Sequence, residues 1–161
     1  MRARLSTLFL PLLLLGLSAP ACRRAPSDPV QALVERGLAA AEERDVEALG
    51  ACLDPAFRGG ERLDRAASLE EARRWFFTYQ SLDLELADLL IERPAEGQAR
   101  ATFRVVMSGR PKEIGGLADV LPRSAVYAFE VEMATGADGQ WRFTKAAWRD
   151  AEGEPPPAPQ Q

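Results

Sequence analysis

Histidine is absent from this chain of 161 residues, and cysteine occurs only twice, at Cys22 and Cys52. Without histidine, the chain lacks the usual general base near neutral pH and the commonest protein ligand for metals. Two cysteines are too few for a disulfide scaffold. Cys52 falls on the apolar face of a predicted helix, so we expect a small buried hydrophobic residue rather than a reactive thiol. We expect neither a metal site nor a cofactor.

Clusters of positive charge are also absent. The 20 Lys and Arg residues include Arg2 and Arg4, which belong to the leader described below. Without these two, 18 basic residues stand against 24 acidic ones, a net charge of −6. A mildly acidic domain with no basic patch argues against a nucleic-acid partner.

The first 21 residues read as a signal peptide. Arg2 and Arg4 precede an apolar run from Leu8 to Leu17, which is shorter than the ~20 residues that a membrane-spanning helix needs. Small residues follow, and then comes Cys22. This order resembles a bacterial lipoprotein signal, which implies that Cys22 is acylated and becomes the new N-terminus.

Lipidation of Cys22 predicts an exported protein anchored in the bacterial cell envelope, on the periplasmic side of the outer membrane. Residues 22–27 would then be a tether. The departure from the lipoprotein pattern is Ala19, where such signals favour Leu. The other interpretation is ordinary signal-peptidase cleavage after Ala21, which leaves Cys22 free.

Three segments in the first half of the domain carry apolar residues at helical spacing. Ser27 or Asp28 can cap the first of the helices, and Asp45 can cap the second. A third helix is expected to begin with a capping box formed by Ser68 and Glu71. We predict a solvated loop over residues 55–67.

Four later segments alternate between apolar and polar residues, which is typical of strands with one buried face. They cover residues 81–93, 98–108, 124–133 and 140–149. The alternation slips by one residue at Ala87-Asp88, which predicts a β-bulge and a bent sheet. We therefore predict an α+β fold, in which three N-terminal helices pack on a strongly bent, cone-like antiparallel sheet of about four strands.

Two patterns indicate a family. Ala39-Ala-Ala-Glu-Glu-Arg-Asp-Val-Glu-Ala-Leu49 leads into a short helix, and Asp138-Gly-Gln-Trp-Arg-Phe-Thr-Lys-Ala-Ala-Trp148 forms the last strand. With the element order, they resemble the nuclear transport factor 2-like (SnoaL-like) superfamily over residues 28–150. The resemblance implies a sheet curled around the helices, often with a pocket. Residues 151–161 are expected to form a disordered, Pro-rich tail.

The superfamily includes isomerases, cyclases and dehydratases as well as binding and assembly domains, so the resemblance does not decide the activity. Its proton-transfer enzymes generally need a carboxylate or histidine inside the cone. The alternation places Asp83 and Glu85 in water, and it pairs Glu130 and Glu132 with arginines on the wet face. We identify no catalytic residue.

The expected pocket is lined by aromatic residues with few polar atoms. Its predicted members are Trp75, Tyr79, Phe103, Tyr127, Phe129 and Trp148. Trp75 is also predicted to be a core anchor on the apolar stripe of the third helix.

Residues 109–123 connect two strands and carry apolar residues at helical spacing, among them Ile114, Leu117 and Leu121. They predict either a short helix that seals the end of the core or a lid over the mouth of the cone.

Two function classes follow. The first is a non-catalytic envelope lipoprotein domain that binds a small apolar ligand or a protein partner. The second is an enzyme of the ketosteroid-isomerase or polyketide-cyclase kind, with an acid/base carboxylate that the sequence does not single out. A homodimer is compatible with either class.

Overall fold

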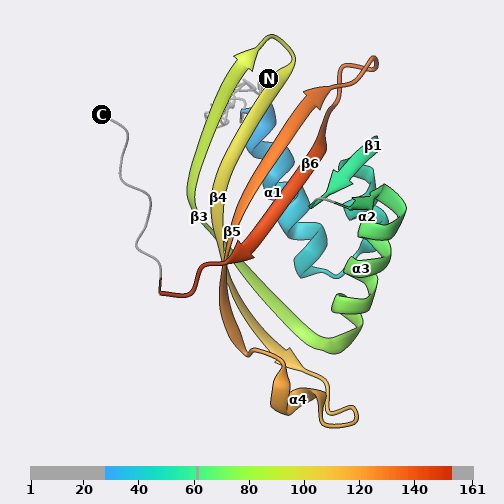
Figure 1. Cartoon of the computed structure of the whole chain (residues 1–161), viewed down its shortest axis with the longest axis vertical. Coiled ribbons are helices and arrows are strands. Elements are labelled where there is room, and N and C mark those ends of the chain that lie inside the picture. Colours follow the sequence, from blue (N-terminus) through green and yellow to red (C-terminus); the bar gives the residue numbers. More distant parts are fainter. Residues whose placement is uncertain (1–27, 61, 154–161) are drawn as a thin grey trace, which may run out of the picture.

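A six-stranded sheet forms one side of the molecule, and three helices cover its concave face (Figure 1). The computed structural model describes residues 28–60 and 62–153, and all structural statements below refer to these residues. The strands lie in the order β2-β1-β6-β5-β4-β3. In chain order the elements are α1 (Pro29–Glu42), α2 (Val46–Ala51), β1 (Leu53–Gly59), β2 (Leu63–Asp64), α3 (Arg65–Thr78), β3 (Tyr79–Ala95), β4 (Gln98–Pro111), α4 (Leu117–Val120), β5 (Ser124–Thr135) and β6 (Trp141–Asp150).

The α+β class and the bent sheet are confirmed, but the predicted number and direction of the strands were wrong. Residues 55–67, expected to be a loop, contain most of β1 and all of β2. β1 runs parallel to β6, where the Phe143 N–H donates to the Cys52 carbonyl at 2.9 Å, so the sheet is mixed. α4 is a fourth helix within the segment 109–123.

Two of the three expected helix caps are confirmed. The Asp28 carboxylate accepts from the Val30 N–H at 2.9 Å, and Asp45 accepts from two backbone N–H groups of α2. The capping box at Ser68 is wrong, because Ser68 lies inside α3, four residues after the observed N-cap of this helix. Its N-cap is Asp64, which accepts from the Ala67 N–H at 2.8 Å.

The expected bulge in β3 is present. The pairing of β3 with β4 shifts between Ala87 and Leu90, and Asp88 has a φ of 54°. Asp88 therefore takes the left-handed conformation that a β-bulge can require. As predicted, Leu84 and Leu86 before the bulge and Leu89 and Ile91 after it pack against the same core.

That core lies between α1 and the sheet. Val30, Leu33 and Val34 of α1 are fully or almost fully buried against apolar residues of β4, β5 and β6. Cys52 is buried and unpaired there, as expected. A second cluster, centred on Phe76, Tyr79 and Met107, fills the opposite end of the domain.

On the other face of the sheet, the ion pairs expected for Glu130 and Glu132 are confirmed for Arg100, whereas Arg104 and Arg142 pair with Asp88 and Asp138. Arg100 lies 4.0 Å from Glu130 and 3.9 Å from Glu132, and Lys145 lies 3.8 Å from Glu132. These side chains are exposed, so each pair contributes little to stability, about 0–1 kcal/mol. Glu130 and Glu132 therefore belong to the solvated face and not to the interior of the cone.

The chain continues a short way past β6. The Ala151 N–H donates to the Val126 carbonyl at 2.8 Å, and Ala151 is buried. The predicted signal peptide (1–21), Cys22 with the tether (22–27) and the end of the predicted tail (154–161) lie outside the described residues.

Candidate functional site

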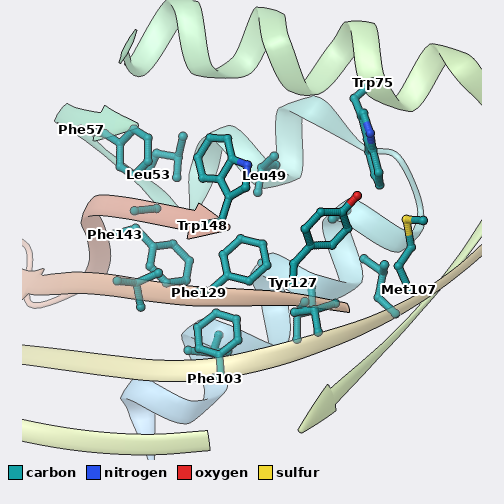
Figure 2. A pocket seen from close by; sticks show the side chains of 18 residues that line it. Leu49, Leu53, Phe57, Trp75, Phe103, Met107, Tyr127, Phe129, Phe143 and Trp148 are labelled. Atoms are coloured by element: carbon teal, nitrogen blue, oxygen red, sulfur yellow. The ribbon is translucent and has the colours of Figure 1, made fainter. Parts of the chain in front are cut away.

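A cavity of about 230 Å³ opens between the helices and the concave face of the sheet (Figure 2). We call it the inner cavity. It is larger than the ~150 Å³ apolar cavity that is known to hold a benzene ring in another protein, and slightly smaller than a drug-sized ligand pocket. Its lining consists of Val34, Gly37, Leu38, Ala41, Leu49, Leu53, Phe57, Trp75, Leu84, Phe103, Val105, Met107, Tyr127, Phe129, Val131, Phe143, Ala146 and Trp148.

Three aromatic rings form a ladder across the sheet side of the inner cavity. Phe103 of β4, Phe129 of β5 and Trp148 of β6 are directly opposite one another in the strand register. The rings of Phe103 and Phe129 stack with centroids 5.2 Å apart and an interplanar angle of 6°, and Trp148 follows at 6.4 Å. Phe103 is buried whereas Trp148 is half exposed, so the ladder leads from the core to the surface.

The helices supply the facing wall. Val34, Gly37, Leu38 and Ala41 lie on the apolar stripe of α1, and Leu49 comes from α2. A Cβ at position 37 would lie 3.1 Å from the Phe143 ring, so glycine lets α1 approach β6 closely.

A second hollow of about 290 Å³ adjoins the inner cavity, and we call it the vestibule. The two share Trp75, Tyr127, Phe129 and Trp148. The vestibule adds three residues from successive turns of α3: Ser68, Glu71 and Ala72. The site therefore passes from an apolar interior to a partly polar rim between α3 and β6.

Tyr127 is the ionisable residue of the inner cavity. Burial, and then the negative charge of Asp150 opposite it on β6, raise the pKa of its hydroxyl. The hydroxyl has no hydrogen-bond partner among the described side chains, and Figure 2 shows its oxygen directed toward the side of Trp75. It therefore remains protonated at neutral pH and is free to donate a hydrogen bond.

The structure brings together five of the six residues predicted for the pocket: Trp75, Phe103, Tyr127, Phe129 and Trp148. Trp75 is half-buried, so it lines the cavity rather than being enclosed in the core. Tyr79 lies elsewhere. It is completely buried in the second cluster, and its hydroxyl donates to the Pro122 carbonyl at 2.9 Å.

Neither Ile114 nor Leu121, two of the three residues predicted for the lid, lines the inner cavity or the vestibule. Ile114 is exposed, Leu117 begins α4, and Leu121 packs against the second cluster. Figure 1 shows α4 at the end of the molecule beyond β4 and β5. Of the two alternatives for residues 109–123, this placement agrees with a short helix at the end of the core. That the segment moves as a lid over the mouth of the cone stays a prediction.

Sequence reasoning identified Trp75 of α3 but missed the parts of the site that come from α1, α2, β1 and the first turns of α3. The stripe of α1 was visible in the sequence, but it was interpreted only as core. Glu71 was assigned to a helix cap, whereas the structure places it at the vestibule. A signal was available, because Ser68, Ala72 and Trp75 recur at the spacing of one helix face.

Charged groups of the described residues lie at the surface, since none is buried. The described part of the chain contains no cluster of three or more potential metal ligands. No helix of residues 28–60 and 62–153 is long and apolar enough to cross a membrane.

Comparison with protein-family models finds no match, and comparison with curated proteins finds none either. Many solved structures are similar in fold. An uncharacterised protein with a cystatin-like fold from Caulobacter vibrioides is 16% identical with a TM-score of 0.63, covering 78% of this chain and 89% of its own. An NTF2-like protein from Cytophaga hutchinsonii is 14% identical with a TM-score of 0.62, covering 79% and 99%.

The hexachlorocyclohexane dehydrochlorinase LinA-type3 from Novosphingobium barchaimii is also similar. It is 14% identical with a TM-score of 0.61, covering 76% of this chain and 84% of its own. At these identities the comparisons show the fold alone. The chain has the cone fold of NTF2-like and cystatin-like proteins, as its sequence resemblance implied.

Proposed function

We propose that this domain binds a small apolar molecule in the inner cavity and leaves it chemically unchanged. The observation that carries the proposal is the ladder of Phe103, Phe129 and Trp148 along a cavity of about 230 Å³. An aromatic occupant can pack against these rings, because an aromatic pair adds about 0.5–1.5 kcal/mol to the burial of apolar area. A ligand with one or two fused rings fits this description.

Ala41→Phe tests the proposal. Ala41 lines the inner cavity from α1, so a phenyl ring at this position occupies the space that a ligand would need. We expect wild-type protein to bind 2-ethylnaphthalene at one molecule per chain by isothermal titration calorimetry, and Ala41→Phe to bind it at least tenfold more weakly. The variant should remain folded, because the added ring fills empty space.

Phe77→Ala provides the control, since Phe77 is exposed on α3 and lies outside the cavity. It should bind the probe as the wild type does. Absence of saturable binding by folded wild-type protein would contradict the proposal and favour a domain that acts through a protein partner.

An enzyme of the ketosteroid-isomerase or polyketide-cyclase kind is the second candidate. In its favour, Glu71 and Tyr127 line the vestibule together, and one fold neighbour is a dehydrochlorinase. A carboxylate and a hydroxyl can divide the roles of base and hydrogen-bond donor in proton transfer. Conversion of a β,γ-unsaturated cyclic ketone to its conjugated isomer, followed by ultraviolet absorbance and lost in Glu71→Gln, would favour this candidate.

We also propose that the protein is exported and is attached to the cell envelope through acylated Cys22. The support is the order of the basic region, apolar run and small residues that precede this cysteine. One acyl chain binds membranes only marginally, whereas the two or three chains of a lipoprotein hold a protein stably.

A further inference from the structure

The inner cavity and the vestibule differ in the polar side chains that line them, and this difference indicates which groups a ligand would place in each. Of the residues that line the inner cavity, only Tyr127 and the two tryptophans bring polar side-chain atoms. The vestibule keeps these three and adds Glu71, whereas the Oγ of Ser68, which also lines it, is buried against Gly59 and does not add a polar group to its surface. A molecule that occupies both therefore has an apolar body inside and a polar group toward α3.

The negative charge at the vestibule limits which polar groups a ligand can place there. Glu71 is the charged residue among those that line it. Arg74, the basic partner of Glu71 at 2.5 Å, lines neither hollow. Asp150 adds negative charge close to the Tyr127 hydroxyl. A carboxylate or phosphate group would meet like charge in the vestibule, whereas a hydrogen-bond donor would find acceptors.

We propose that the ligand is an amphiphile with a compact apolar body and a hydrogen-bond-donating head, either a hydroxyl or an ammonium group. The body lies along the ladder of Phe103, Phe129 and Trp148. The head lies in the vestibule, where it donates to the Glu71 carboxylate and, when it is a hydroxyl, accepts from the Tyr127 hydroxyl. This inference rests on the proposed binding of an apolar molecule in the inner cavity.

Four probes with one body and different heads test it: 2-ethylnaphthalene, 2-(2-naphthyl)ethanol, 2-(2-naphthyl)ethylammonium and 2-naphthylacetate. We expect the alcohol and the ammonium to bind the full-length protein about tenfold more tightly than the hydrocarbon, as one hydrogen bond to a charged group allows. The carboxylate should bind more weakly than the hydrocarbon. Calorimetric titrations at neutral pH and moderate salt give all four dissociation constants.

Glu71→Gln should remove most of the advantage of the ammonium and the disadvantage of the carboxylate, while affinity for the hydrocarbon stays the same. Tyr127→Phe should reduce the advantage of the alcohol more than that of the ammonium. Glu70→Gln is a matched control. Glu70 pairs with Arg73 at 2.5 Å on the same helix, and its side chain is as exposed as that of Glu71, but it does not line the vestibule.

The outcomes separate the two proposals. If folded protein binds none of the four probes, the proposed function itself fails. If the hydrocarbon binds but the four heads give equal affinities, or the carboxylate binds best, the proposal of an apolar site is supported. The proposal of a hydrogen-bond-donating head is then wrong. The same holds if Glu70→Gln changes the selectivity as much as Glu71→Gln does.

Discussion

Ser68 and Gly59 lie against each other where α3 meets β1. The Ser68 Oγ is buried and has no hydrogen-bond partner among the described residues. A Cβ added to Gly59 would lie 2.4 Å from this oxygen, which is a clash. The next nearest atoms, in the Phe57 ring and at the Ser68 Cβ, would both be 3.4 Å away, which is close to an ordinary contact. The serine hydroxyl alone therefore excludes a side chain at position 59.

This contact predicts a strong coupling between two substitutions. Gly59→Ala should lower the free energy of unfolding by about 1–3 kcal/mol, because it overpacks the contact. Ser68→Ala should leave stability unchanged or raise it, because it removes a buried hydroxyl that forms no hydrogen bond. The double variant should recover at least ~0.5 kcal/mol of the loss in chemical denaturation. Strict additivity of the two single changes would show that the hydroxyl is not the obstacle.

The strand register explains why most aromatic residues of the site could be predicted at the scale of single residues. Phe103, Tyr127 and Phe129 follow strict alternation, so their shared face could be inferred from the sequence. Ser68 could not be placed correctly, because Asp64 and Ser68 are both good capping residues and their spacing does not choose between them. The structure shows that Asp64 caps the helix.

Among the elements, the segment between β4 and β5 is held in place by a buried tyrosine. The Tyr79 hydroxyl donates to the Pro122 carbonyl at 2.9 Å. Backbone hydrogen bonds hold the same segment at both ends, from Lys112 to the Thr78 carbonyl and from Gly109 to the Arg123 carbonyl. Burial raises the pKa of Tyr79, so the hydroxyl stays a donor at neutral pH.

Tyr79→Phe should loosen this segment. Loss of the hydrogen bond should lower the free energy of unfolding by about 0.5–1.5 kcal/mol. Amide exchange at Gly109 and Lys112 should become faster, while the Phe143 amide, which bonds to Cys52 at the other side of the sheet, should keep its rate. Tyr127→Phe is the control, because that hydroxyl has no hydrogen-bond partner among residues 28–60 and 62–153. Equal acceleration at all three amides would indicate global destabilisation instead.

The strands that could not be predicted from the sequence are those whose apolar residues do not alternate regularly, and β1 is the main example. In β1 only Leu53, Phe57 and Gly59 are buried, and Pro55 interrupts the run. Its pairing with β6 is irregular between Leu53 and Arg58. β3, in contrast, was predictable together with its bulge, because a slip in long alternation is visible in the residues themselves.

For the whole molecule, we predict that the attachment to the envelope depends on one cysteine. Cys22→Ser should move the protein from the membrane fraction to the soluble fraction of the cell, because serine removes the thiol that an acyl chain would need. Fractionation followed by detection of the protein measures this. Cys52→Ala is the control, since Cys52 is buried in the core and should not affect the fraction. A membrane-bound Cys22→Ser variant would refute the anchor.

The site as a whole could be predicted only in part, because its two walls come from distant segments of the chain. Alternation identified the wall formed by β4, β5 and β6. The opposite wall depends on how closely α1 approaches β6, which is set by the contact between Gly37 and Phe143. A packing distance of this kind is not encoded in the periodicity of either segment. Whether the cone is filled or hollow could therefore be learned only from the structure.

The positions of the tryptophans have an optical consequence. Trp75 and Trp148 line the cavity and the vestibule, whereas Trp141, the third of the three in the chain, lines neither. An occupant that displaces water from the vestibule changes the surroundings of the first two indole rings and leaves the third as a constant background. The intrinsic emission of the unlabelled protein then reports whether the cone is empty, and it can do so in a crude lipid extract before any ligand is known.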